Sequence, residues 1–315
     1  MARFVFRRAL SAIGLLFAVS VVVFAIFEVI PSYDPAAAIA GRTASPADIQ
    51  AVKKSFGFDK PVYVQYANTM KQIFTGEIIS YQTRLPVVDQ FRQKFPATLS
   101  LVVPAALLWM GFGILFGTIS AVKAGKTADR ALTVLALLGV SIPVFLLGAV
   151  FLYFFAVKLK IFPNTGYVGL TSNPSEWAYH LILPWITLAI LFVGFYSRVL
   201  RSNVLDTMNQ DFVRTARAKG LPGRRVLVRH VLRSSLIPII TLFGLDFAAA
   251  IGGATLVTET VFNIPGIGQY EAQAISHLDI PPILVGAIFT AFFVVLFSAL
   301  VDIIHALLDP RIRLS

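Results

Sequence analysis

The stretch LSLVVPAALLWMGFGILFGTISAV at residues 99–122 carries no charged side chain. It exceeds the roughly 20 residues that an α-helix needs to cross about 30 Å of hydrocarbon. Charged residues make up only 14% of the chain and the mean hydropathy is +0.78, which leaves too little polar surface for a soluble protein of 315 residues. Comparable apolar runs occur at 9–30, 131–157, 181–200, 236–258 and 283–308. The sequence therefore predicts an all-α polytopic membrane protein with six transmembrane helices.

The first apolar run raises the question of a secretory signal, because it follows MARFVFRR and the later AAAIAG resembles a cleavage site. The apolar stretch from Ala9 to Phe27 is longer than the 7–15-residue core of such a signal. We therefore expect residues 1–30 to form a short tail and an uncleaved first helix. Glu28 falls near the outer end of this helix, where its carboxylate can reach water.

The net charge of +11 is best explained as a topology signal. With both termini placed in the cytoplasm, the inner loops are rich in Lys and Arg, whereas the short outer loops carry only Lys158 and Lys160. Cytoplasmic loops of membrane proteins show this excess of basic residues. The charge therefore gives no support for nucleic-acid binding.

Residues 31–97 are too long for a simple connection and contain helical spacing in SPADIQAVKKSFGFDKPVYVQYANTMKQIF, with Ser45 or Asp48 as the N-cap. They predict a small external helical segment. The loops at 158–180 and 259–281 contain PNTG and NIPGIG, which predict turns that seat a partner or gate the pore. For the first loop, a plain connection is an equal alternative.

The motifs of enzymes are absent or lack their context. AGKT at 124–127 resembles the end of a phosphate-binding loop, but Ser120 stands where that loop needs glycine. Gly111, Gly113 and Gly117 lie in an apolar run, where they favour close helix packing over dinucleotide binding. The scattered histidines make no metal-binding pair; they are His180, His230, His277 and His305. We expect a non-enzymatic chain that binds no cofactor or metal.

Asp246 lies at the middle of the predicted fifth helix. Ionisable groups at membrane depth are costly and usually face a bundle interior or a water-filled cavity. Asp246 is therefore a candidate for the translocation path, with a hydrogen bond to a neighbouring helix as the alternative. Asp302 and His305, three residues apart near the inner end of the sixth helix, are expected to pair locally.

The predicted cytoplasmic loop 201–234 is strongly basic and leads into RTARAKGLPGRRVLVRHVLRSSLIP at 214–238. Gly220 predicts the end of one short helix, and Pro222 predicts the start of another. In the second helix, arginines recur four residues apart and predict one basic stripe, which could lie on lipid headgroups or on a partner protein. They are Arg225, Arg229 and Arg233.

RTARAKG at 214–220 resembles the EAA-type loop of ABC importer permeases, although Arg214 and Thr215 stand where the general motif has Glu and Ala. The longer stretch is similar to the loop of the dipeptide/oligopeptide/nickel branch, in which a proline comes later, as Pro238 does here. GFDKPVYVQY, FPATLSL, LGVSIPVF, GGATLVTETVFNIPGIG and ALLDPRIR also resemble the B-type permease subunit of that branch. SYDP at 32–35, GEIISY at 76–81 and Asp246, where glutamine is expected, depart from its pattern.

The resemblance implies the type I ABC importer permease fold, with a transmembrane core at 98–315. It implies a plasma (inner) membrane location in a bacterium or archaeon, a C-type permease partner, an external substrate-binding protein, and two cytoplasmic ATPase subunits that hold ATP and Mg. The substrates would be di- or oligopeptides. The residues that couple the permease to the ATPase would be Arg214, Thr215, Ala216, Arg217, Ala218, Lys219 and Gly220.

Other functions remain open from the sequence. The same machinery could import nickel chelates, glutathione or sugars, because substrate selection rests largely with the binding protein. A secondary transporter driven by an ion gradient would use Asp246 as its coupling group. A membrane anchor or sensor would use the basic loop to bind lipid or a signalling partner.

Overall fold

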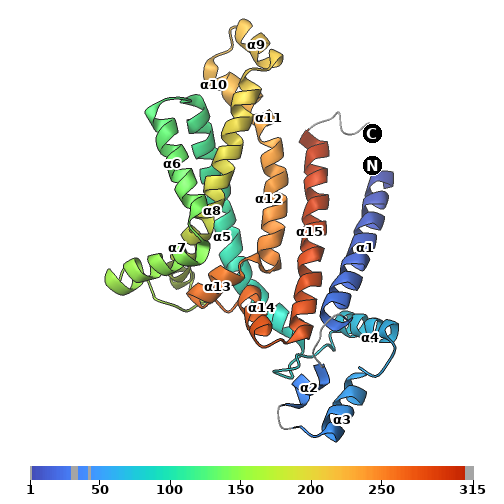
Figure 1. Cartoon of the computed structure of the whole chain (residues 1–315). Helices are drawn as coiled ribbons and strands as arrows, with labels where there is room; N and C mark the ends of the chain where they lie inside the picture. Colours follow the sequence, from blue (N-terminus) through green and yellow to red (C-terminus); the bar gives the residue numbers. More distant parts are fainter. Residues whose placement is uncertain (1, 30–34, 42–43, 309–315) are drawn as a thin grey trace.

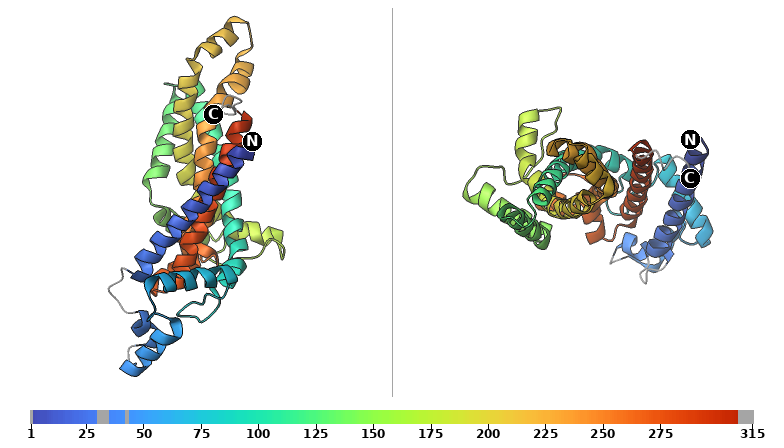
Figure 2. Two further views of the ribbon diagram at one scale, coloured as in Figure 1. Left: turned by 90° about the vertical axis from the view of Figure 1, so that its right-hand side faces the viewer. Right: turned by 90° about the horizontal axis from the view of Figure 1, so that it is seen from above.

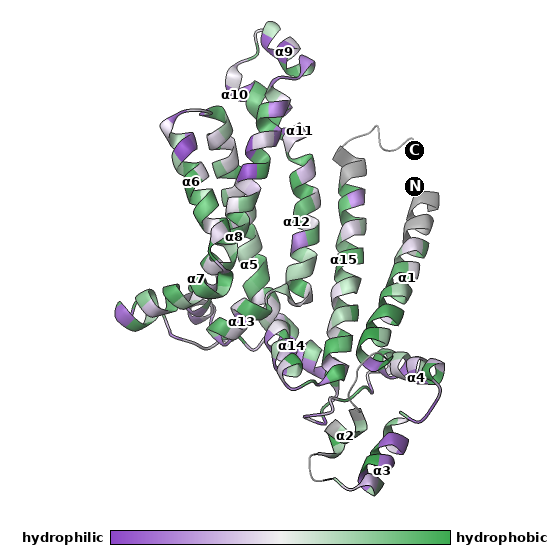
Figure 3. Cartoon of the chain, viewed as in Figure 1, coloured by the Kyte–Doolittle hydropathy of each residue, from purple (hydrophilic) through white to green (hydrophobic). Residues whose placement is uncertain are grey.

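The computed structural model describes residues 2–29, 35–41 and 44–308. These residues form helices and one isolated bridge between Ile79 and Pro86, with no β-strand. Long helices stand side by side along one direction, with small helices at both ends (Figure 1). Apolar residues cover the length of the long helices, whereas hydrophilic residues gather on the small helices at the two ends (Figure 3). This arrangement is that of a membrane protein, as the sequence predicts.

Five helical stretches are long and apolar enough to cross a membrane. The first joins α1 (Ala2–Phe24) to the π-helical turn η1 (Ala25–Val29), and the fourth joins α12 (Ile237–Ala249) to η4 (Ala250–Ala254). The others are α5 (Val87–Val122), α8 (Pro174–Met208) and α15 (Ile280–Leu308). The external segment predicted at 31–97 thus shares its last residues with α5.

The span predicted at 131–157 is not one straight helix. α6 (Thr127–Ser141) meets α7 (Val144–Phe151) and η2 (Leu152–Lys158) at a bend of 100°. Pro143 lies at the break, and Ile142 before it is extended, with φ −87° and ψ 123°. Proline cannot donate a backbone hydrogen bond and disfavours helical dihedrals in the preceding residue, which explains the break. Six spans result only if this bent pair counts as one, and α7–η2 extends sideways from the bundle (Figures 1 and 2).

The centre of the fold is the close packing of α5 on α8. A Cβ atom on Gly113 would lie 2.8 Å from the Tyr196 Cβ, and one on Gly117 would lie 2.7 Å from the Ser197 carbonyl oxygen. Gly111 has no such neighbour within 4 Å. The predicted packing role is therefore confirmed for Gly113 and Gly117, whereas Gly111 packs against no other helix within the described residues.

We expect Gly117→Ala to lower the free energy of unfolding by about 1–3 kcal/mol, because the new methyl group overpacks against a backbone carbonyl. Gly111→Ala is the matched control on the same helix. It should leave stability unchanged or slightly raised, since alanine is the better helix former. Thermal unfolding of both variants in detergent measures the difference, and equal midpoints would contradict the packing role.

The segment predicted to be external forms α2 (Pro35–Ala40), α3 (Pro46–Phe56) and α4 (Val62–Thr75), at the end of the molecule opposite α9 and α10 (Figure 1). Ser45 is the N-cap of α3, and Asp48 completes a capping box, with the Ser45 N–H donating to its carboxylate at 2.9 Å. These hydrogen bonds from Ser45 hold the pKa of Asp48 below its usual range. Of the two predicted N-caps, Ser45 is therefore correct.

The region at 259–281 contains more helix than the predicted turns. α13 (Leu256–Phe262) ends at Asn263, which has φ 52°, and α14 (Ile267–Ser276) begins after Gly266. Proline and glycine in NIPGIG therefore separate two short helices. The predicted local pairing of Asp302 with His305 involves a side chain outside the described residues.

Candidate functional site

The basic loop folds into a helix-turn-helix beyond the end of α8. It contains α9 (Asp211–Ala218), α10 (Gly223–Val226), the π-helical turn η3 (Leu227–Leu232) and α11 (Arg233–Ser235). α9 and α10 lie at the same end of the molecule as the start of α1 and the end of α15 (Figure 1). The basic loop and the ends of the outermost helices are therefore on one side of the membrane.

α9 is fixed to the bundle by its apolar face. Val213 and Ala216 are buried in the main hydrophobic core together with Val204 of α8 and Val226 of α10. Of the seven residues predicted to couple to an ATPase, Ala216 points inward and the other six are exposed. One face of α9 is thus packed on the core, and the other presents exposed basic side chains to which a partner protein can bind.

The turn between the two helices depends on Gly220. Its φ of +75° lies in the left-handed region, which glycine adopts without a steric penalty. Its N–H donates to the Arg217 carbonyl at 2.9 Å, and Pro222 is the N-cap of α10. The helix break predicted at Gly220 is confirmed.

The arginine stripe is less regular than predicted. Arg225, Arg229 and Arg233 are all exposed, but η3 interrupts the α-helix between the first and the last of them. A π-helical turn contains more residues than an α-helical turn, so residues four apart do not stay in line. The three arginines therefore form a broader basic face rather than one narrow row.

An ion pair joins α6 to α8 on the side of the bundle where the basic loop begins, and sequence analysis missed it. The Arg201 guanidinium on α8 donates to both Asp129 oxygens, at 2.7 and 2.8 Å, and Asp129 is buried at 4% exposure. The same carboxylate accepts hydrogen bonds from the Gly125 N–H at 2.8 Å and from the Ser120 hydroxyl. AGKT at 124–127 therefore belongs to a turn closed by Asp129. The signal in the sequence was the single acid Asp129 in the short basic segment 123–130.

The sequence left two roles open for Asp246, a place in the translocation path or a hydrogen bond to a neighbouring helix, and the structure contains such a hydrogen bond. Asp246 accepts from the Tyr196 hydroxyl of α8 at 2.7 Å. Tyr196 is 1% exposed and Asp246 is half-buried. The carboxylate thus has a partner on its buried side and remains open on the other.

Comparison with known families identifies this architecture. The model of the family described as binding-protein-dependent transport system inner membrane component matches residues 113–314, and that of its N-terminal region matches residues 1–102. The chain belongs to this family. The family is one of membrane permeases, so this multi-pass chain is a permease subunit of an ABC transport system.

Relatives match this permease over nearly its whole length. A probable peptide ABC transporter permease protein, y4tP, of Sinorhizobium fredii is 36% identical, over 98% of this chain and 99% of its own. The di/tripeptide transport system permease protein DppB of Pseudomonas aeruginosa is 36% identical, over 99% of each chain. The oligopeptide transport system permease protein AppB of Bacillus subtilis is 34% identical, over 99% of this chain and 100% of its own.

The permease also holds a buried and a partly buried carboxyl group, Glu259 and Glu271, at the end of the bundle opposite α9 and α10, and sequence analysis missed both. Glu259 is fully buried and accepts hydrogen bonds from Thr98 at 2.8 Å, Thr255 at 3.0 Å and the Gln269 N–H at 2.9 Å. These contacts join α13 and α14 to α5, and burial raises the pKa of Glu259. One Glu271 oxygen is buried and has no hydrogen-bond partner among the described residues, and burial, with the charge of Glu259, raises the pKa of Glu271 to about 8.

Glu271 predicts a pH dependence of stability. Because its folded-state pKa lies above the unfolded value of 4.5, its protonated form stabilises the fold, and this stabilisation is lost as pH rises towards about 8. We expect the wild-type thermal midpoint to fall between about pH 5 and about pH 8, and to fall less in Glu271→Gln, which cannot ionise. Identical pH profiles of the two proteins would show that Glu271 does not titrate in this range.

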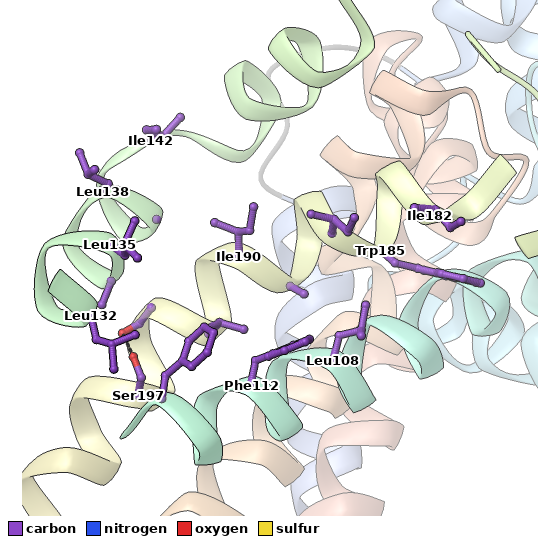
Figure 4. A pocket seen from close by; sticks show the side chains of 17 residues that line it. Leu108, Phe112, Leu132, Leu135, Leu138, Ile142, Ile182, Trp185, Ile190 and Ser197 are labelled. Carbon is purple, nitrogen blue, oxygen red and sulfur yellow. Dashed lines mark hydrogen bonds between the residues drawn. The ribbon is translucent and has the colours of Figure 1, made fainter. Parts of the chain in front are cut away.

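A groove of about 710 Å³ lies between α5, α6 and α8 of the permease (Figure 4). Leu108, Phe112, Leu135 and Ile190 point towards it, and Ser197 is the one residue with a polar side chain in its lining apart from the Trp185 ring. Peptide N–H and C=O groups would lose hydrogen bonds there, which costs several kcal/mol for each group. The groove therefore suits hydrocarbon, and a peptide path must lie elsewhere.

Proposed function

We propose that this permease forms, with a C-type permease subunit, the translocation path of an ATP-driven importer of di- or oligopeptides. The observation that carries the proposal is the basic helix-turn of α9 and α10, which is exposed on one side and seated on the core by Val213 and Ala216 on the other. The peptide substrate class is supported by the relatives named as peptide, di/tripeptide and oligopeptide permeases. No observation favours nickel chelates, glutathione or sugars.

In this proposal, ATP and Mg²⁺ are bound by two ATPase subunits, and the permease itself is not an enzyme. Closure of the ATPase dimer would move α9, and the buried contacts of α9 with α8 and α10 would pass the movement to the bundle as a rigid body. The bundle would then alternate between outward-open and inward-open states. Arg214, Thr215, Arg217, Ala218, Lys219 and Gly220 would face the ATPase.

The proposed orientation places both termini and the basic loop in the cytoplasm of a bacterial or archaeal cell. Positive residues gather on the inner side of membrane proteins, and the loop contains the densest group of them. Residues 31–97 would then meet the external binding protein, while residues 98–315 form the transmembrane core. The groove of Figure 4 would face lipid chains or apolar helices.

Reconstitution into proteoliposomes tests the proposal. We expect peptide uptake only when the second permease, the ATPase subunits, the binding protein and ATP are all present. Uptake that follows a proton or sodium gradient without ATPase subunits would instead support the secondary transporter. Failure to recover any ATPase or second permease with the affinity-purified chain would support the anchor or sensor.

We also propose that Asp246 contributes to the substrate path through its open side. Asp246→Asn keeps an acceptor for the Tyr196 hydroxyl but removes the charge, so the complex should assemble while peptide uptake changes several-fold, about the effect of one charge-assisted hydrogen bond. Tyr196→Phe is the control for the interhelical bond alone. Wild-type uptake across peptides of different charge in Asp246→Asn would leave Asp246 with a structural role only.

A further inference from the structure

A second pocket, of about 280 Å³, opens on the external side of the permease. It lies where η1, the helices α3 and α4, the segment after α4 and the start of α15 meet. In Figure 1 this is the end of the bundle at which α1 and α15 approach α4. Its volume is close to the lower limit for small-molecule sites, about 300 Å³, so it fits the end of a short peptide.

One wall of the pocket is aromatic. The rings of Phe56 and Phe58 are stacked at 5.7 Å, and Tyr81 meets them edge-on at 5.5 and 6.0 Å. The Arg84 guanidinium lies 5.4 Å from the Phe56 ring centroid, which shows that this cluster already attracts one cation. The wall can therefore hold an apolar side chain beside a positive group.

α4 contributes a polar face to the lining of the pocket. Gln65, Asn68, Thr69 and Gln72 are spaced three and four residues apart, so they share one side of the helix, and all four line the pocket. The Gln65 amide nitrogen donates to the Lys60 carbonyl at 2.7 Å, which leaves its oxygen as an acceptor. Asn68, Thr69 and Gln72 make no side-chain hydrogen bond within the described residues. These groups match the N–H and C=O groups of a peptide backbone.

Two carboxylates line the pocket: Glu77 is exposed and accepts a hydrogen bond from the Thr75 hydroxyl at 3.1 Å, whereas Glu28 is withdrawn from solvent and has no cation beside it within the described residues. Glu28 is half-buried and accepts a hydrogen bond from the Tyr81 hydroxyl at 3.4 Å, which is a long and weak contact. No Lys, Arg or His side chain of the described residues lies within ion-pair distance of it. A carboxylate removed from bulk water is stabilised by a positive partner, and the pocket offers room for one.

From these features we propose that the pocket binds the free N-terminal ammonium of a peptide. Glu28 holds the ammonium, the aromatic wall holds the first side chain, and the polar face of α4 holds the backbone. Peptide as the ligand class rests on the proposed function, whereas the need for a primary ammonium rests on Glu28 and its surroundings. The site lies on the outer face of the permease, before the membrane path.

Calorimetric titration of the complete importer in lipid nanodiscs, without the binding protein, tests this inference. The probes are the dipeptide Ala-Phe and its N-acetylated form, which lacks the ammonium. We expect wild type to bind Ala-Phe about tenfold or more tightly than the acetylated form. Glu28→Gln should remove this preference by weakening the binding of Ala-Phe while leaving that of the acetylated form unchanged.

Two further variants keep the test decisive. Glu176→Gln changes an exposed carboxylate at the start of α8 and should leave both affinities at wild-type values. Asn68→Leu, at an exposed position that the fold should tolerate, should weaken both probes alike. Equal binding of the two probes by wild type, or unchanged affinities in Glu28→Gln and Asn68→Leu, would overturn the inference.

Peptide uptake by the same complex, supplied with binding protein and ATP, separates this inference from the proposed function. ATP-driven uptake without ammonium-dependent binding would reject the pocket and leave the importer intact. Ammonium-dependent binding without any ATP-driven uptake would reject the proposed function and leave the pocket selective for a small amine.

Discussion

Reversal of the charges at Arg217 and Lys219 together is expected to lower ATP-driven peptide uptake by about tenfold or more. Both side chains are exposed on α9 and the following turn, while the buried face of α9 is untouched, so folding and membrane insertion should be preserved. The expected loss comes from like-charge repulsion where complementary charges should meet an ATPase surface. Uptake and ATPase activity of the reconstituted importer are the two measurements.

The matched control is reversal of Arg225 and Arg229, which makes the same change of charge on η3 and α10. If that face lies on anionic lipid, uptake should fall far less than in the α9 variant. Gly220→Pro should reproduce the α9 effect, because proline cannot adopt a φ of +75° and lacks the N–H that binds the Arg217 carbonyl. Wild-type uptake and wild-type ATPase stimulation in the α9 variant would show that α9 does not dock.

Removal of the Asp129 carboxylate is expected to cause the largest loss of stability, about 3–5 kcal/mol in Asp129→Ala. The substitution leaves the Arg201 guanidinium without its partner and removes the acceptor of the Gly125 N–H and the Ser120 hydroxyl. The Arg201 side chain is 33% exposed, so water offsets part of this cost and the lower end of the range is expected. The thermal midpoint in detergent measures it.

Two controls distinguish the ion pair from a general effect of charge. Asp206→Ala removes an exposed acid of α8 and should leave the midpoint near that of wild type. Asp129→Ala combined with Arg201→Met should recover part of the stability, because no unpaired charge remains. If Asp129→Ala were no less stable than Asp206→Ala, the buried pair would not be important for the fold.

The membrane helices and several of their ends follow from local physical chemistry, which explains why they could be predicted. An apolar run in lipid must satisfy its own backbone hydrogen bonds, and the α-helix does so within a single segment, so the stretch at 99–122 is helical. Ser45 caps α3 through its own nearby backbone, and Gly220 ends its helix because glycine adopts positive φ freely. In each case the cause and the effect lie within a few residues of each other.

The bend after α6 marks the limit of this local reasoning. Pro143 was visible in the sequence, but membrane helices often tolerate proline, so its effect on direction could not be derived. Gly111 shows the same limit, because its spacing suggested packing while the rotation of α5 leaves it without a neighbour.

By itself, the sequence determined that this chain is a helical membrane protein with a basic helix-turn on one side and small helices on the other. Only the tertiary structure decided which polar groups meet. Asp129 with Arg201, Tyr196 with Asp246 and Thr98 with Glu259 are each joined across different helices. Hydropathy fixes that a helix crosses the membrane but leaves its rotation and tilt free, and these decide which side chains face each other. The pocket at Glu28 likewise exists only because residues far apart in the sequence, from η1, α3, α4 and α15, come together in the fold.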